Sequence, residues 1–244
     1  MKILAIDTAT LAGGAALMDE ERLIAEYRLD VAVRHSERIM VAIDHLLKES
    51  HTKLSDLDAI AVSIGPGSFT GLRVGLATAK GLATGAGRPL VLVPTLAAMA
   101  HPFSHSKYLI APWINARRGE VYWSLFENQD NHLVQYTQDA ATSPEDAIEE
   151  IGDVMREQKT RFSGILFVGD GALKYRSIIQ KKLEAKAAFP TLSLQFPSAA
   201  SVAELGLELL TKGEGMAPDL AVPSYLRASY AELKRNASEG KMRV

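Results

Sequence analysis

Residues 65–73 read Gly65-Pro66-Gly67-Ser68-Phe69-Thr70-Gly71-Leu72-Arg73, and the fold of the first half is organised around them. Residues 59–64, just before them, form an apolar run with the length and β-branching of a buried strand. Ser68 or Thr70 can cap a helix, which we expect to run from residue 70 to about 85. The segment therefore predicts a strand, a glycine-rich turn and a helix.

Two interpretations of this turn compete. Backbone amides at a helix N-terminus bind phosphate well, and glycines allow a close approach. However, five residues separate Gly65 from Gly71, and Leu72 rather than lysine follows, so the turn is not a Walker A loop. The third glycine also comes one residue too late for the dinucleotide fingerprint. We therefore favour a structural turn that begins a helix suited to close packing.

Small residues recur at every fourth position of the expected helix and so share one face. They are Gly71, Gly75, Ala79 and Ala83. Such a face is useful only where something packs very close to it. A contact within the chain is the commoner use of such a row, and a contact with a partner protein is the other.

Composition places the chain among ordinary globular proteins, with 244 residues, 47% of them hydrophobic and 23% charged. The absence of cysteine excludes disulfides, thiolate zinc sites and a thiol nucleophile. A formal charge of −2 gives no global indication of nucleic-acid binding. We find no secretory signal and no apolar run of the ~18 residues that a membrane span needs, and we expect a soluble cytoplasmic protein.

The two halves of the chain follow the same order of elements, a β-meander and then alternating helices and strands. We therefore expect an α/β protein of two similar lobes. Residues 1–103 would form the N-terminal lobe with the partner-binding helices, 104–227 the C-terminal lobe, and 228–244 a polar, frayed tail. Expected helices lie at 36–49, 70–85, 95–100, from 144 onward, at 172–184 and at 201–210.

Five motifs occur in order along the chain: Asp7-Thr8-Ala9-Thr10, His35-Ser36-Glu37, Gly65 to Arg73, Ala116-Arg117-Arg118-Gly119-Glu120-Val121-Tyr122, and Pro223-Ser224-Tyr225-Leu226-Arg227. Together they resemble the TsaB (YeaZ) family of bacterial subunits for threonylcarbamoyladenosine biosynthesis in tRNA. The resemblance spans nearly the whole chain, and the glycine motif is its most specific part. It implies an actin/Hsp70/sugar-kinase-like (ASKHA, RNase H-like) fold with mixed sheets flanked by helices.

The resemblance also implies a function. The chain would be a non-catalytic scaffold or activating subunit of a threonylcarbamoyl transferase complex that modifies the adenosine next to the anticodon. Its partners would be a TsaD-like catalytic subunit and a TsaE-like ATPase, and tRNA would be reached only through the complex. Alone, the chain would form a homodimer through the same surface, since a self-complementary patch permits this.

We expect the partner to dock on the helices at 36–49 and 70–85, which would form a helical bundle with those of the partner. The expected contact residues are His35, Ile39, Met40, Ile43, Gly71, Arg73, Gly75, Leu76, Ala79 and Ala83.

The resemblance places a nucleotide cleft between the lobes, and several of its positions depart from an ATP-binding pattern. The expected cleft residues are Asp7, Thr8, Thr10, Asn115, Gly169 and Gly171. Ala9 stands where ATP-binding relatives have glycine, and Asn115 stands where many TsaB-like chains have aspartate. We favour a vestigial cleft with no catalytic residue and no tightly bound cofactor, which leaves weak binding of ATP or ADP open. The alternative is a stand-alone kinase or ATPase that uses Asp7.

A metal site is not expected. Thr95 and Met99 stand where the resemblance would place a His-x-x-x-His pair, and neither replaces imidazole as a ligand. His101 and His105 have the spacing of such a pair, but Pro102 argues for a loop there. The chain has no His-Glu-x-x-His motif, so a metallopeptidase is the least favoured function.

Overall fold

The computed structural model describes residues 1–30, 35–130, 132–157 and 162–226, except for the side chains of residues 35–37. The first sheet has the order β3-β2-β1-β4-β5. Its strands are β1 (Lys2–Asp7), β2 (Ala12–Asp19), β3 (Leu23–Asp30), β4 (Ala59–Ser63) and β5 (Leu90–Val93). β2 runs antiparallel to β1 and β3, whereas β4 is parallel to β1 and β5 is parallel to β4. β4 is buried along its whole length, as central parallel strands are.

The second sheet repeats this plan in the order β10-β7-β6-β11-β12. Its strands are β6 (Leu109–Arg117), β7 (Glu120–Trp123), β10 (Ala140–Thr142), β11 (Ile165–Val168) and β12 (Ala187–Ala188). β7 is antiparallel to β6 and β10, and β11 is parallel to β6 and β12, in the same sequence of directions as before. β8 (Phe126–Gln129) and β9 (His132–Gln135) form an added hairpin on β6. The expected α/β architecture of two similar lobes with mixed sheets is confirmed.

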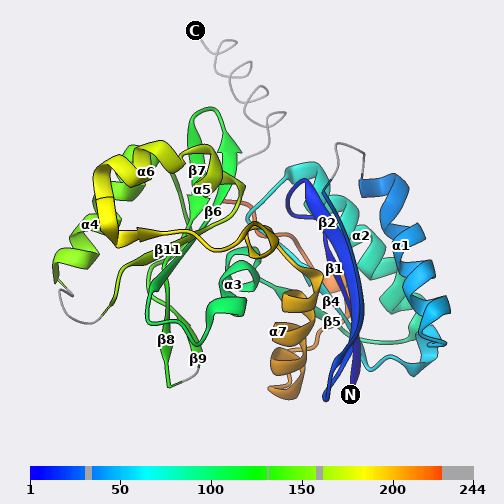
Figure 1. Ribbon diagram of the computed structural model, residues 1–244. Helices are drawn as coiled ribbons and strands as arrows, with labels where there is room; N and C mark the ends of the chain where they lie inside the picture. Colours follow the sequence, from blue (N-terminus) through cyan, green and yellow to red (C-terminus); the bar gives the residue numbers. More distant parts are fainter. Residues whose placement is uncertain (31–34, 131, 158–161, 227–244) are drawn as a thin grey trace, which may run out of the picture.

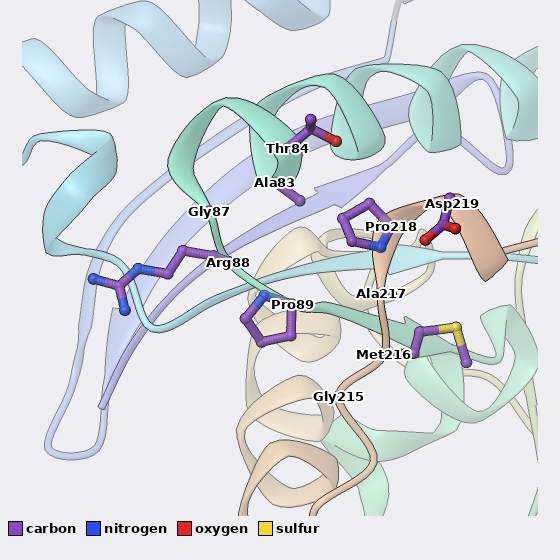
Figure 2. A pocket seen from close by; sticks show the side chains of 10 residues that line it. All are labelled: Ala83, Thr84, Gly87, Arg88, Pro89, Gly215, Met216, Ala217, Pro218 and Asp219. Carbon is purple, nitrogen blue, oxygen red and sulfur yellow. The ribbon is translucent and has the colours of Figure 1, made fainter.

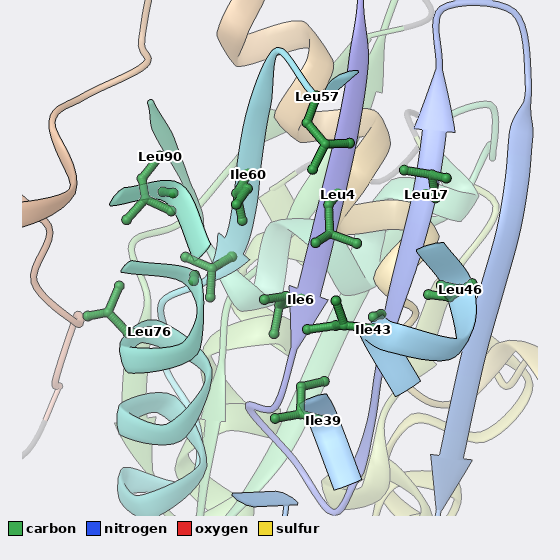
Figure 3. Close-up of a cluster of buried hydrophobic side chains, with 14 of the residues drawn as sticks. Leu4, Ile6, Leu17, Ile39, Ile43, Leu46, Leu57, Ile60, Leu76 and Leu90 are labelled. Carbon is green, nitrogen blue, oxygen red and sulfur yellow. The ribbon is translucent and has the colours of Figure 1, made fainter. Parts of the chain in front are cut away.

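Two long helices cover one face of the first sheet (Figure 1). They are α1 (His35–Glu49) and α2 (Phe69–Ala86), and the short helix η1 (Leu54–Asp56) follows α1. Ile39 and Ile43 of α1 and Leu76 of α2 pack with Leu4 and Ile60 of the sheet in one hydrophobic core (Figure 3). The apolar stripe of each helix therefore faces the sheet, which is the burial that stabilises an amphipathic helix.

The other face of the first sheet is covered by α7 (Ala199–Thr211), whose Val202 and Ala203 pack with Ile3, Ala61 and Val91. The sequence-based division assigns this helix to the second lobe, and its packing differs from that expectation. The reason is that two small apolar side chains of α7 meet a sheet face that is also small and apolar. The boundary near residue 103 stays a prediction.

Helix α3 (Thr95–Ala100) and the short helix η2 (His101–Phe103) connect the two halves. Leu96 and Met99 of α3 are buried against the second sheet, in a cluster with Ile110 and Val168. α3 also contacts α7, so these two helices lie between the sheets (Figure 1). Arg28 adds a hydrogen-bonded link, because its guanidinium donates to the carbonyls of Ser193 and Phe196 at 3.1 and 2.9 Å.

The outer helices of the second lobe are α4 (Pro144–Glu157), α5 (Asp170–Lys174) and α6 (Arg176–Leu183). The single helix expected at 172–184 is therefore wrong, since the chain leaves helical geometry at Tyr175, where φ is −103° and ψ is 15°. Trp113, Trp123 and Phe167 are fully buried at the centre of this lobe. The short helices η3 (Glu184–Lys186) and η4 (Leu192–Leu194) lead back toward α7.

After α7 the chain returns along the first lobe as an extended segment, residues 216–226, which we call the C-terminal strap. Its short helix η5 (Pro218–Leu220) contacts α2, and Met216 forms a two-way backbone bridge with Leu90. Ala221 is buried in the core beneath α2. Within the described part of the chain, every helix is too short or too polar to cross a membrane. The expected tail at 228–244 lies outside the described residues.

Candidate functional site

The carboxylate of Asp7 lies at the C-terminal end of β1 and is almost fully buried. Its Oδ1 accepts hydrogen bonds from the backbone N–H of Ala9 at 2.9 Å and from the hydroxyl of Ser63 at 2.6 Å. Thr10 is also buried, and its hydroxyl donates to the carbonyl of Ala12 at 2.8 Å. These groups hold the loop of residues 7–10 to the ends of β1 and β4.

The glycine-rich turn packs directly on this loop. The backbone N–H of Ser68 donates to the carbonyl of Ala9 at 2.7 Å. A Cβ atom added at Gly67 would lie 2.4 Å from that same carbonyl oxygen, and one added at Gly71 would lie 2.0 Å from the carbonyl oxygen of Thr8. The turn therefore packs against the backbone of residues 8 and 9, at the corner where the family resemblance places a vestigial nucleotide cleft.

The row of small residues on α2 faces into the protein, which corrects the expectation that it faces a partner. A Cβ atom added at Gly75 would lie 2.2 Å from Thr8 Oγ1, and that hydroxyl donates to the carbonyl of Gly71 at 2.8 Å. Ala79 and Ala83 are fully buried in the core. The row is small because α2 must lie close to β1 and its loop.

Other residues of the expected interface are also internal. Ile39, Ile43 and Leu76 are 6% exposed or less, because they form the core between the helices and the sheet. Met40 and Arg73 are exposed, as the expectation requires. His35 begins α1, but its side chain lies outside the described set.

A second row of small residues does face solvent. Ala77, Gly81 and Gly85 follow Arg73 at intervals of four along α2, and all four residues are exposed. On the neighbouring α1, Met40 is 48% and Val41 is 68% exposed. The outer face of the two helices therefore combines large exposed apolar side chains with a smooth row.

The C-terminal strap contacts the chain just before the glycine-rich turn. The backbone N–H of Ser224 donates to the carbonyl of Ile64 at 2.8 Å. Gly65 has φ = 125°, and a Cβ atom there would lie 2.3 Å from the carbonyl oxygen of Ser224, so only glycine fits. Sequence reasoning missed this contact. The only signal for it was that both motifs belong to the same family resemblance.

The expected cleft residues of the second lobe form a separate group. The backbone N–H of Asn115 donates to Asp170 Oδ1 at 3.0 Å, and Asn115 Oδ1 accepts from Lys174 Nζ at 3.1 Å. Burial raises the pKa of Asp170 above its usual range, although hydrogen bonds from Asn115 and Gly171 oppose this shift. Added Cβ atoms at Gly169 and Gly171 would lie 2.2 and 2.9 Å from the carbonyl oxygen of Trp113. These two glycines thus serve close packing on β6.

Two of the positions considered for a metal, Thr95 and Met99, are buried by packing, whereas His101 is partly buried and His105 is exposed. Thr95 is fully buried and accepts from the backbone N–H of Gly65 through its hydroxyl at 3.0 Å. Met99 is 3% exposed, and His101 Nε2 lies 3.0 Å from Glu204 Oε2. Among the described residues, no three histidine or carboxylate side chains are grouped in a way that could hold a metal ion.

An open groove of about 610 Å³ lies between the C-terminal end of α2 and the start of the strap (Figure 2). It is lined by Ala83, Thr84, Gly87, Arg88, Pro89, Gly215, Met216, Ala217, Pro218 and Asp219. The groove lies at the opposite end of α2 from the Asp7 corner and contains none of the expected cleft residues. It is therefore a surface feature of the first lobe that is separate from the expected cleft.

The two sheets of the same plan, with the Asp7 corner packed at the end of β1, define a two-lobed α/β protein with mixed sheets. A family model described as "TsaD: tRNA N6-adenosine threonylcarbamoyltransferase" matches residues 29–235. A Bacillus subtilis protein named tRNA threonylcarbamoyladenosine biosynthesis protein TsaB is 35% identical over 96% of this chain and 97% of its own length. The Escherichia coli protein of the same name is 31% identical over 98% of this chain and 100% of its own length.

A solved structure of YeaZ from Pseudomonas aeruginosa is also similar, with a TM-score of 0.74 and 27% identity. The match covers 92% of this chain and 99% of that one. The chain belongs to the TsaB (YeaZ) family.

Proposed function

We propose that this chain takes part in the biosynthesis of threonylcarbamoyladenosine in tRNA, as a non-catalytic subunit that docks on a TsaD-like catalytic subunit. The names of its relatives support the pathway, and their matches extend over nearly the whole chain. The family model that matches most of the chain describes the transferase itself, which supports a catalytic partner of similar fold. Such a role places the chain in the cytoplasm, where tRNA is modified.

The observation that carries the docking role is the outer face of α1 and α2. Met40 and Val41 of α1 expose large apolar side chains, and the neighbouring α2 exposes a row of small residues, Ala77, Gly81 and Gly85. A second helical pair can approach closely along such a row and cover the exposed apolar side chains. We propose that the TsaD-like subunit covers this face, and that a second copy of the chain covers it when the chain is alone. A TsaE-like ATPase would join the complex, which alone would contact tRNA.

A non-catalytic role is supported by the packing of the Asp7 corner. A phosphate loop needs backbone N–H groups that face the ligand, whereas here the N–H of Ala9 donates to Asp7 and that of Ser68 donates to Ala9. We therefore propose that no cofactor binds tightly and that any ATP or ADP binds weakly. The stand-alone kinase or ATPase has less support for the same reason.

Reconstitution tests this function. Purified TsaD-family and TsaE-family chains from the same organism are supplied with unmodified tRNA and the activated threonylcarbamoyl donor, with and without this chain. We expect threonylcarbamoyladenosine to form only when this chain is present. Equal product in its absence would contradict the proposal.

A further inference from the structure

Three side chains form a cluster where the C-terminal strap crosses the start of α2: Arg73 and Tyr225 are exposed, and Phe69 is half-buried. The rings of Phe69 and Tyr225 are stacked, with centroids 4.9 Å apart. The guanidinium carbon of Arg73 lies 3.8 Å from the centroid of the Phe69 ring, and Arg73 Nε donates to the Tyr225 hydroxyl at 3.0 Å. The arginine is thus held on both sides, by a cation–π contact and by a hydrogen bond.

The backbone around this cluster is fixed as well. Ser224, next to Tyr225, is hydrogen-bonded to Ile64, and Ala221 is anchored in the core. Phe69 and Arg73 lie in the first turns of a helix that Ser68 caps, because its hydroxyl accepts from the N–H of Gly71. A side chain held from two rigid elements loses little further conformational entropy when it binds, which favours affinity.

The charge of Arg73 is not balanced at this place. Within the described part of the chain, Nε–H is the only guanidinium group of Arg73 with a hydrogen-bond partner, and no carboxylate lies within salt-bridge distance. Arg73 is exposed, so its remaining donors can reach a ligand. A planar fork of N–H groups suits carboxylates and phosphates, which it can bind with two parallel hydrogen bonds.

The surroundings decide between these two ligands. The large exposed side chains of the strap are apolar or aromatic: Leu220 and Val222 are 68% and 67% exposed, and Tyr225 and Leu226 are 39% and 37% exposed. Its exposed polar side chains are Asp219 and Ser224, and neither carries a positive charge. An arginine and a tyrosine with apolar neighbours are typical of the energetic centre of a protein interface. An RNA-binding surface would instead need several cations to contact the phosphate backbone.

We propose that Arg73, held by Phe69 and Tyr225, binds a carboxylate side chain of the protein that docks on α1 and α2, and that the strap is part of this interface. This inference rests on the proposed function, and it extends the docking face from the two helices to the strap. It also gives the Pro223-to-Leu226 motif a role, which is to hold an arginine ready for its partner.

The test compares Arg73→Lys with Arg22→Lys, a control at an exposed arginine in the β2–β3 hairpin. The probe is the purified TsaD-family chain of the same organism, and the readouts are its dissociation constant and the urea unfolding of this chain. Lysine keeps the charge but loses the fork and most of the stacking, so we expect Arg73→Lys to weaken binding about tenfold. Tyr225→Phe keeps the ring stack and loses only the hydrogen bond, so about threefold is expected. The urea midpoints of Arg73→Lys and Tyr225→Phe should stay close to that of wild type, because the contacts that they lose within the chain lie at the surface.

Val41→Asp on α1 separates this inference from the proposed function. If Val41→Asp weakens binding and Arg73→Lys does not, the docking face stands and the role of Arg73 is refuted. If neither variant weakens binding, both are refuted. If Arg73→Lys leaves the protein complex intact but weakens its binding of tRNA, the ligand is an RNA phosphate, and the carboxylate proposal is overturned.

Discussion

The stability of Gly75→Ala would show whether the row of Gly71, Gly75, Ala79 and Ala83 on α2 faces the protein interior. In the folded protein that methyl group would lie 2.2 Å from Thr8 Oγ1, and Thr8 is fully buried. The threonine would have to rotate, and its hydrogen bond to the carbonyl of Gly71 would be lost. Gly75→Ala therefore introduces a steric conflict and an unpaired buried hydroxyl together.

The size of the effect can be worked out from three contributions. Overpacking in a well-packed core costs about 1–3 kcal/mol of unfolding free energy. Leaving a buried polar group without its partner costs about 1–3 kcal/mol more, although local relaxation reduces the sum. Alanine is the better helix former by about 1 kcal/mol, which offsets part of this. We expect Gly75→Ala to lower the free energy of unfolding by about 2 kcal/mol, which is a large share of a typical domain's stability.

Urea unfolding followed by circular dichroism measures this change, and the helix supplies its own control. Gly81 has no atom within 4 Å of an added Cβ, so Gly81→Ala should stabilise the protein by about 0.5–1 kcal/mol. Thr8→Ala removes the conflicting hydroxyl, so the double variant Thr8→Ala with Gly75→Ala should be more stable than the sum of the single changes predicts. A Gly75→Ala protein as stable as Gly81→Ala, with no coupling to Thr8, would refute the inward-facing row.

Three further predictions concern the cleft and the contact between the lobes. Asp7→Asn keeps the oxygen that accepts hydrogen bonds from Ala9 and Ser63, so the variant should still support threonylcarbamoyladenosine formation. Calorimetry with ATP and Mg²⁺ should show only weak binding by wild type and by Asp7→Asn. Loss of activity in folded Asp7→Asn would indicate a catalytic carboxylate. Burial raises the pKa of Asp170, so the protonated carboxyl favours the folded state below the ordinary pKa near 3.8, and this contribution is lost as the pH rises through the raised value. Asp170→Asn does not titrate, so its free energy of unfolding should rise relative to that of wild type as the pH increases from 3.5 to 7. A difference in urea unfolding that does not depend on pH would contradict this. Arg28→Gln removes a charged group that donates to two carbonyls near η4, so it should lower the free energy of unfolding by about 1 kcal/mol; an unchanged urea midpoint would show that this link does not stabilise the fold.

The sequence predicts the strands and the two long helices because their signals are local. The run at 59–64 is continuous and apolar, and β4 occupies Ala59–Ser63. The four-residue spacing also predicts correctly that Gly71 and Gly75 share one face of a helix. It cannot tell which neighbour that face meets, because a second row at Ala77 and Gly81 has the same spacing two residues out of phase.

Contacts between segments that are far apart in sequence could not be predicted from the sequence. Phe69 and Tyr225 stack although 156 positions separate them, and no periodicity relates two such residues. The return of α7 to the first sheet is of the same kind, because a helix with small apolar residues fits several faces equally well. The break at Tyr175 was also missed, since the residues around it carry no proline that would predict the end of a helix.

The affinity of this chain for the TsaD-family chain of its own organism tests the docking face most directly. Val41 and Leu192 are matched positions, because they are 68% and 71% exposed and Leu192 lies in η4 and not on α1 or α2. Calorimetric titration should show that Val41→Asp raises the dissociation constant about tenfold or more, since a charge would be buried in the interface, while Leu192→Asp leaves it unchanged. Equal affinity for wild type and Val41→Asp would contradict docking through α1 and α2.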